Sequence, residues 1–233
     1  EDAVLEARKW DETKIKKKKR KRNLDNNGNF PMEKYDLIPL QLINEKICNR
    51  NNFFVPQNLN DQDVLTTHQK EYYERLSSLT LSEKEIRPIG FPMSRELIIR
   101  EKKIAQGTIE CSNFSINNGI SMNIAGGTHH AFYDKGEGFC MLNDQAIAAN
   151  YLLNNSLVNK ILIIDLDVHQ GNGTASIFKN NSNVFTLSFH GQKNYPFRKE
   201  NSDLDFGFDD FTNDDFYLKK LKEIIPRTID RFQ

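Results

Sequence analysis

The residues of this 233-residue chain best suited to bind a metal ion lie in one short polar segment, Asp165 to Gly173. Asp165, Asp167 and His169 are spaced two residues apart, and in an extended strand such residues point to the same face, so we expect them to converge. Aspartate and neutral histidine are good ligands for Zn²⁺ or Mn²⁺, and buried carboxylates call for a compensating cation. A surface Asp–His ion pair is the alternative. The adjacent turn Gly171-Asn172-Gly173, which permits close backbone approach, favours the metal site.

Two adjacent histidines, His129 and His130, follow the pair Gly126-Gly127. A tight turn at this point would let both imidazoles enter one pocket, whereas the alternative is one core and one surface histidine. Each imidazole needs a partner that fixes its tautomer, and Asp165 and Asn172 are the candidates. Because one partner is acidic and the other neutral, we expect two different basicities, as an acid and a base in one site require.

Strand and helix patterns alternate along the chain, which predicts an α/β domain with a largely parallel sheet flanked by helices. The β-branched run Lys160–Val168 is the clearest strand, and we expect it to be buried on both faces. Further strands are expected at Ser121–Ala125 and Asn183–Phe189, so that the polar segments follow strand ends, where such sheets bind ligands. Helices are expected over Asp36–Arg50, Asp61–Leu81, Ser94–Ala105, Asn143–Leu153 and Asp214–Ile225, with a turn-rich break at Arg87–Pro92.

Composition limits the global interactions of the chain. With 32 basic and 32 acidic residues the formal net charge is zero, which gives no overall attraction to nucleic acid. Three widely spaced cysteines indicate reduced thiols in an intracellular protein, and no apolar run approaches the roughly 20 residues that span a membrane. Lys16–Arg22 is an unbroken basic run within an arm expected over residues 1–28; it suits a nuclear localisation signal, a nucleic-acid contact or a solvated tail.

Several motifs in the same order resemble the histone deacetylase family. They are GGTHHA (126–131), GFCMLND (138–144) and DLDVHQGNGT (165–174). PMEKYDLIP (31–39), RPIGFP (87–92) and HGQKNYPFRKENSDLD (190–205) are most similar to the class IV branch and to bacterial deacetylases. The resemblance covers residue 31 to the end of the chain and implies an arginase/deacetylase-like fold over residues 29–233, corresponding to the first two-thirds of such a domain.

The resemblance also implies roles for the polar residues. Asp167 and His169 would be two of three zinc ligands, and His130 would be the general base for a metal-activated water. His129, held by Asp165, would be its electrostatic or acid partner, and Asn172 would orient His130.

Two further features of the family carry over to this sequence. A structural potassium ion would be held by Asp165, Ser188 and nearby backbone oxygens. The narrow tunnel for the substrate lysine would be lined by Gly138, Phe139 and Tyr195. Cys140 would lie at the foot of this tunnel, or would simply be a small buried thiol.

The function implied is zinc-dependent hydrolysis of acetyl or other acyl groups on lysine side chains of proteins such as histones. That activity would belong to chromatin regulation in the nucleus, the cytoplasm or both. The family's third zinc ligand, an aspartate, and its oxyanion-stabilising tyrosine would lie beyond Gln233, so we expect an incomplete domain. The later acids, from Asp203 to Asp215, are expected in a loop and a helix start, where capping or solvation explains most of them, and Tyr217 is expected to pack.

Two alternatives stay open at this stage. The chain could be a truncated or inactive deacetylase-like module that binds acyl-lysine. It could also be a binuclear manganese hydrolase of the arginase type, but that class places an extra aspartate where this chain has Gly171.

Overall fold

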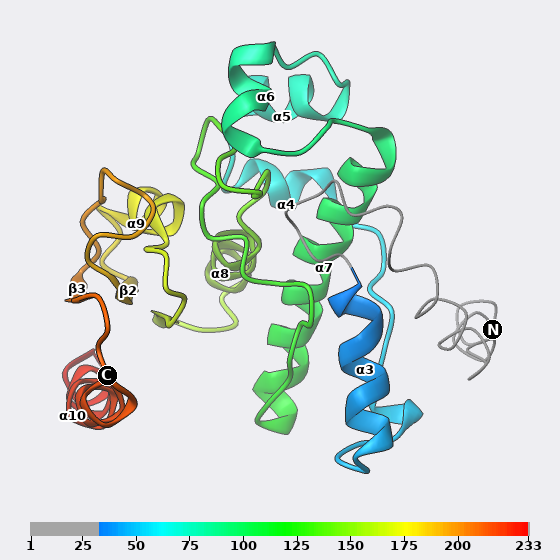
Figure 1. Ribbon diagram of the computed structural model, residues 1–233. Coiled ribbons are helices and arrows are strands. Elements are labelled where there is room, and N and C mark those ends of the chain that lie inside the picture. The colour runs from blue at the N-terminus through cyan, green and yellow to red at the C-terminus, as the bar shows by residue number, and fades with distance from the viewer. Residues whose placement is uncertain (1–32, 233) are drawn as a thin grey trace, which may run out of the picture. The chain divides into compact units, whose positions relative to one another are not determined.

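The computed structural model describes residues 33–232 (Figure 1). These residues divide after Val55 into two compact units. The predicted arm over residues 1–28 and its basic run lie outside the described residues. The first unit contains helix α3 (Lys34–Asn44) and the short 3-10 helix η1 (Arg50–Asn52). One continuous helix over Asp36–Arg50 is therefore a wrong prediction. The Asn49 side chain accepts the Asn51 N–H and caps a new turn, a conformation that asparagine favours over a helix interior.

Three parallel strands form the sheet of the second unit, in the order β1 (Ile161–Asp165), β2 (Val184–Gly191) and β3 (Leu204–Phe208). The α/β class with a parallel sheet is thus confirmed. The sequence predicted a loop where β3 lies, so this strand corrects the prediction. A second correction concerns Ser121–Ala125, which is not a strand. The Asn123 amide there donates to the Ile104 carbonyl and to Thr108 Oγ1, which ties the segment to a helix instead of a neighbouring strand.

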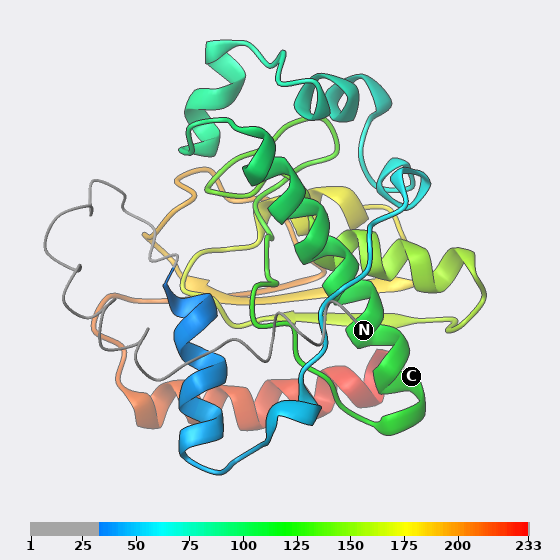
Figure 2. The same ribbon diagram turned by 90° about the vertical axis from the view of Figure 1, so that its right-hand side faces the viewer.

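The sheet is covered by helices on both faces, as Figure 2 shows for the long C-terminal helix α10 (Asp214–Phe232) beneath it. On one face Ile161, Ile163 and Val184 pack with α8 (Asp144–Asn154) and α9 (Asn172–Phe178). On the other face Leu187, Phe189 and Phe208 pack with apolar residues of α10. β2 is largely buried, but every residue of β1 is only half-buried because β1 lies at the edge of the described sheet. The predicted burial of Lys160–Val168 on both faces thus holds only in part: β1 packs against a hydrophobic cluster on each face, whereas Leu166 and Val168 beyond it are exposed.

A second core lies among the helices that precede the sheet. These helices are α4 (Asp61–Leu65), α5 (Lys70–Ser77), α6 (Glu83–Ile89), α7 (Arg95–Asn118) and α8. Val64, Leu76, Ile89 and Ile147 are fully buried in it. The expected helix Asp61–Leu81 is divided into α4 and α5, α7 continues well beyond Ala105, and α6 extends through Pro88 into the expected turn. Within the described part of the chain every helix is too short or too polar to cross a membrane.

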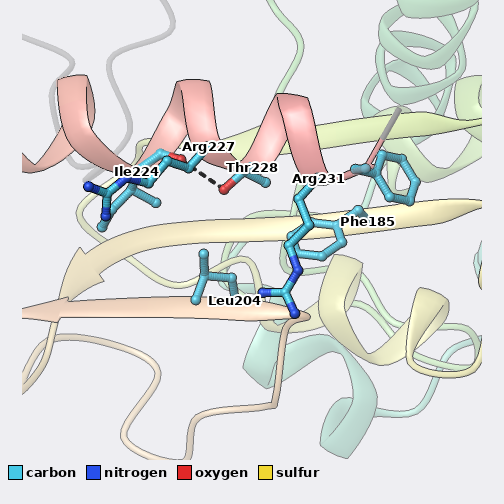
Figure 3. A pocket seen from close by; sticks show the side chains of 7 residues that line it. Phe185, Leu204, Ile224, Arg227, Thr228 and Arg231 are labelled. Carbon is cyan, nitrogen blue, oxygen red and sulfur yellow. Dashed lines mark hydrogen bonds between the residues drawn. The ribbon is translucent and has the colours of Figure 1, made fainter.

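An apolar cavity of about 300 Å³ lies where α10 crosses β2 and β3 (Figure 3). Phe185 and Leu204 come from the two strands, and the remaining lining residues come from α10. None of the residues predicted to act chemically lines this cavity. The candidate site lies instead at the carboxyl ends of β1 and β2.

Candidate active site

The Gly126-Gly127 turn brings both histidines to the end of β1. Gly127 has a φ of +94°, a conformation that glycine adopts without strain. The buried Asp144 carboxylate accepts hydrogen bonds from the N–H groups of Gly127 and Thr128 and from the Thr128 hydroxyl. These bonds fix the turn, and as a result the rings of His129 and His130 lie 4.1 Å apart between centroids.

Each histidine has the partner that the sequence predicted. His129 Nδ1 lies 2.6 Å from Asp165 Oδ2, and His130 Nδ1 lies 2.7 Å from Asn172 Oδ1. Because an amide oxygen can only accept, His130 Nδ1 carries the proton and its Nε2 is left with a lone pair. Asn172 is the first residue of α9, so the start of this helix sets the orientation of His130.

The two glycines beside Asn172 are required by close packing. A Cβ at Gly173 would overlap the carbonyl group of Ala131, and one at Gly171 would overlap the Asp165 carboxylate. The N–H of Thr174 donates to the carbonyl oxygen of His129 at 3.1 Å. The Gly-Asn-Gly turn therefore packs directly on the histidine segment, as its composition indicated.

The electrostatic environments of the two imidazoles differ in the expected sense. Burial, together with the neighbouring His129, lowers the pKa of His130 to about 4. Burial also opposes protonation of His129, but the Asp165 carboxylate outweighs burial and the pKa of His129 is raised. One histidine is thus held neutral and the other is biased toward the charged form.

Asp167 and His169 form the predicted metal-ligand pair. Asp167 Oδ1 lies 2.9 Å from His169 Nδ1, and their side chains are 50% and 41% exposed. Carboxylate oxygen and imidazole nitrogen are both ligand types that a divalent zinc ion takes in proteins. Among residues 33–232 no third histidine, cysteine, aspartate or glutamate joins them.

The expected convergence of Asp165 with Asp167 and His169 is a wrong prediction. β1 ends at Asp165, so the two-residue periodicity of a strand does not continue through the segment that follows. The Asp165 carboxylate faces His129 and also accepts the Asp167 N–H at 3.0 Å. Asp165 therefore belongs to the histidine pair and not to the pair of metal donors.

Two of the three residues predicted to line a tunnel lie against His130. A Cβ at Gly138 (φ +56°) would approach His130 Cδ2 to 2.6 Å, so only glycine fits beside the ring. The Tyr195 ring stands edge-on to His130, with centroids 5.0 Å apart, and lies 6.0 Å from His169. Phe139 packs on Phe91, with ring centroids 5.0 Å apart, and its ring lies close to Gly90. Gly138 and Tyr195 thus border His130 directly.

Cys140 and the predicted potassium ligands have protein partners. Cys140 is buried, its thiol lies 3.4 Å from the Gly138 carbonyl oxygen, and burial raises its pKa. Asp165 and Ser188 are paired in register across β1 and β2. Ser188 Oγ lies 3.0 Å from His190 Nδ1. Two potential oxygen ligands are therefore adjacent, and the potassium ion itself stays a prediction.

Sequence reasoning missed several residues that hold the site together. His68, set apart from the other histidines, donates from Nδ1 to the Phe132 carbonyl and accepts the Asn143 N–H on Nε2, both at 2.9 Å. Asn143 in turn donates to the Ala131 carbonyl next to His130. Position 68 carried no signal beyond its residue type, whereas Asn143 and Asp144 lie in the quoted motif 138–144.

Two of the later acids, Asp203 and Asp205, make specific bonds, whereas Asp214 and Asp215 are exposed in the first turn of α10, the helix start that the sequence predicted. Asp205 accepts from the amide of the buried Gln170 at 2.8 Å, and Asp203 accepts from the N–H and hydroxyl of Thr186. These bonds join the chain around the start of β3 to Thr186 in β2 and to Gln170 in the segment after β1. Tyr217 packs on Phe208 at 5.0 Å, as expected.

Glu137 is the remaining missed residue of the site. Its Oε1 accepts from the Tyr195 hydroxyl at 2.5 Å and lies 3.3 Å from Asn172 Nδ2. Its other oxygen pairs with Lys135 Nζ at 3.3 Å. It directly precedes Gly138, and the residue type alone gave no sign of this role.

Comparisons with known proteins agree with this architecture. An uncharacterized protein of Picosynechococcus sp. is 40% identical over 192 residues, which cover 82% of this chain and 64% of the relative. Histone deacetylase 2 of Arabidopsis thaliana is 26% identical, over 88% of this chain and 55% of the relative. The chain thus spans somewhat more than half the length of these relatives.

Solved structures share the fold. A histone deacetylase (HDAC) homolog crystallised in complex with SAHA aligns with a TM-score of 0.72 at 21% identity, over 86% of this chain and 61% of that one. An HDAC homolog from Aquifex aeolicus aligns with a TM-score of 0.66 at 22% identity, over 78% and 57% of the two chains. The arginase/deacetylase-like fold prediction is therefore confirmed.

The sequence model described as a histone deacetylase domain matches residues 29–233, which is most of the chain. The chain therefore belongs to the histone deacetylase family.

Proposed function

We propose that this chain carries the proton-transfer part of a zinc-dependent hydrolase that removes acetyl or other acyl groups from lysine side chains. The observation that supports this most strongly is the pair of buried histidines with opposite partners, Asp165 for His129 and Asn172 for His130. The two predicted metal ligands, Asp167 and His169, lie between Asp165 and Asn172 in the chain. The rings of His169 and His130 lie 6.0 Å apart.

His130 has the properties of a general base. It is neutral near pH 7, because burial lowers its pKa to about 4, and its Nδ1–H is held by Asn172, which leaves Nε2 to accept a proton. Positioned proton transfer of this kind is worth about 10²–10⁴-fold in rate. Asp165 biases His129 toward the imidazolium, which would stabilise negative charge and donate a proton to the leaving amine.

Asp167 and His169 would supply two of the ligands of a zinc ion. When bound, zinc would polarise the acyl carbonyl and make water more acidic. Gly138 and Tyr195 border His130 and would form part of the tunnel wall along the lysine stem, with Phe139 next to them. Aromatic and glycine residues would suit the apolar four-carbon stem and would help to exclude bulk water.

Histones as substrates, a structural potassium ion and a nuclear or cytoplasmic location are predictions from the resemblance. Any contact of Lys16–Arg22 with nucleic acid is a prediction of the same kind.

The proposal is tested with the protein in its full natural length and an acetyl-lysine peptide. We expect acetate release that a metal chelator abolishes and that zinc restores. His130→Ala should lower kcat by at least about 100-fold. Lys193→Ala, which changes an exposed side chain, is the matched control and should retain full activity. Turnover that survives both the chelator and His130→Ala would contradict the proposal.

A second candidate function is a module that binds acyl-lysine without hydrolysing it. It is favoured by one observation, the presence of only two clustered metal donors among the described residues. Saturable binding of the peptide by folded, zinc-loaded, full-length protein with no acetate release would support this candidate and exclude the hydrolase.

A further inference from the structure

Glu137 occupies a half-buried position where three polar side chains meet. It lies in a tight backbone turn, because its N–H donates to the Cys140 carbonyl and its carbonyl accepts the Cys140 N–H, both at 2.9 Å. Its Oε1 is shared between the Tyr195 hydroxyl at 2.5 Å and Asn172 Nδ2 at 3.3 Å. This carboxylate therefore contacts both a predicted tunnel residue and the residue that orients His130.

Asn172 is the link between Glu137 and His130. Its Oδ1 accepts from His130 Nδ1 at 2.7 Å, while its Nδ2 faces Glu137. An amide is the group that can accept on one side and donate on the other without ionising. The carboxylate of Glu137 thus determines which way the Asn172 amide points, and with it the tautomer of His130.

Tyr195 is fixed by the same oxygen. Its hydroxyl donates to Glu137 Oε1, and its ring then stands edge-on to His130 with an interplanar angle of 83°. Glu137 keeps its charge because hydrogen bonds from Tyr195 and the ion pair with Lys135 outweigh the effect of burial, so its pKa is lowered. One acidic side chain thus contacts both Tyr195 and Asn172, the residue that orients the His130 imidazole.

We propose that Glu137 is a positioning residue for the general base, and that it makes Asn172, instead of aspartate, the required residue at position 172. This inference rests on the proposed function for its catalytic meaning, but the coupling between the two positions can be measured without any turnover. An aspartate at position 172 would place a second carboxylate about 3.3 Å from Glu137 Oε1, where like charges repel.

The test exchanges the amide and the carboxylate between the two positions. Asn172→Asp alone places two carboxylates face to face, whereas Glu137→Gln alone leaves two amides that can still form a hydrogen bond. The double variant again has one amide and one carboxylate, now with the amide at position 137 and the carboxylate at position 172. The unfolding equilibrium constant of the full chain is measured in urea for all four proteins. The Nδ1–H resonance of His130 is recorded in each.

We expect Asn172→Asp to raise the unfolding equilibrium constant about tenfold and Glu137→Gln to change it by less than about threefold. In the double variant the constant should return to within about threefold of the parent value. Such a coupling is in the range measured for residues in direct contact. The His130 Nδ1–H resonance should weaken in Asn172→Asp and return in the double variant. In the full-length enzyme kcat should follow the same pattern, with KM less affected.

Lys135→Met is the matched control, because it removes the exposed partner of Glu137 and leaves the contacts with Asn172 and Tyr195 in place. It should change the unfolding constant by less than about twofold. The proposal would be overturned if the double variant showed no recovery, so that its change in the unfolding constant equalled the product of the two single changes. If the parent protein showed no activity but the two positions were clearly coupled in stability, the result would count against the hydrolase function. It would still support the interaction between Glu137 and Asn172.

Discussion

The two parts of the candidate site differ sharply in how completely the described chain builds them. In the histidine part, His129, His130 and Asn172 are buried, and each imidazole Nδ1 has a protein partner. In the metal-donor part, Asp167 and His169 are about half exposed, and their side chains meet mainly each other. The two parts of one site are thus organised to different degrees.

The difference shows which interactions need no metal. The histidine part is held by glycine packing, by the carboxylates of Asp144 and Asp165 and by the start of α9. These are ordinary folding interactions, which cost nothing further when substrate arrives. The metal-donor part lacks them, so an ion and additional ligands would be needed to order it. We therefore expect substitutions in the histidine part to affect stability, and those in the metal-donor part to affect mainly metal binding.

The largest expected effect is that of Gly173→Ala. Its Cβ would overlap the Ala131 carbonyl, which cannot move without displacing His130, so we expect a loss of about 3 kcal/mol in the free energy of unfolding. Urea denaturation followed by circular dichroism measures this loss. Gly191→Ala is the milder control, because its nearest contact would be Asn194 Cβ at 3.0 Å. Equal stability of the two variants would show that the Gly-Asn-Gly turn is not packed on the histidines.

Carboxylates two residues apart should respond differently to amide substitution. Asp165→Asn removes the charge that holds His129 in a nearly buried position and should cost about 2 kcal/mol of stability. Asp167→Asn changes a half-exposed side chain and should stay within about 0.5 kcal/mol of the parent in the absence of metal. Thermal unfolding in a chelator measures both variants. A greater loss for Asp167→Asn would reverse the comparison.

Glu101 in α7 is a buried carboxylate outside the site that lacks the partners of Asp165. It pairs with Arg100 at 2.7 Å, but its Oε2 has no hydrogen bond, and burial raises its pKa to about 7. The folded state therefore keeps the proton up to about pH 7, while the unfolded chain loses it near pH 4.5, so stability falls as the pH rises through this range.

His68 has the opposite effect on stability over almost the same range of pH. Burial lowers its pKa to about 4, so the folded state is neutral where the unfolded chain is protonated, and stability rises between pH 4 and 6.5. Glu101→Gln removes the carboxyl group whose ionisation lowers the stability as the pH rises. We expect stability to increase between pH 4.5 and 6.5 by about 2 kcal/mol more in this variant than in the parent, measured by urea denaturation. Parallel pH profiles of the two proteins would contradict this expectation.

Zinc should have the smallest effect on this chain. Catalytic zinc sites use three protein ligands, and Asp167 and His169 are the two donors that cluster here among the described residues. We expect a micromolar excess of zinc to raise the Tm by less than about 2 °C, with that small rise lost in Asp167→Ala. Tight stoichiometric binding by the 233-residue chain would contradict the expectation and would point to further ligands outside the described residues.

The sequence predicted the histidine part better than the metal-donor part for a physical reason. Adjacent histidines after Gly-Gly and a Gly-Asn-Gly turn specify close packing locally, and Asp165 and Asn172 were the polar residues available to meet the two imidazoles. The convergence of Asp165, Asp167 and His169 assumed that the strand continues beyond Asp165, whereas it ends there. Where a strand stops depends on its partner strands, and these are not visible in a local pattern.

Other errors share that origin. Ser121–Ala125 has a strand-like pattern, but Asn123 is bound to the carbonyl of Ile104 and the hydroxyl of Thr108 in α7. β3 was missed because Asp205 and Gly207 disfavour strands, although Asp205 is satisfied there by the amide of Gln170. Glu137 resembles any exposed acidic residue in the sequence, and only its distances to Tyr195 and Asn172 reveal its place.

The difference between the two histidines is tested most directly by nitrogen-detected NMR of the imidazoles at pH 6.5, the ordinary pKa of a histidine. We predict that His129 is mainly protonated on both nitrogens, with Nδ1–H bonded to Asp165, and that His130 is neutral with its proton on Nδ1. Two neutral rings, or a neutral His130 with its proton on Nε2, would contradict the assignment of His130 as the base.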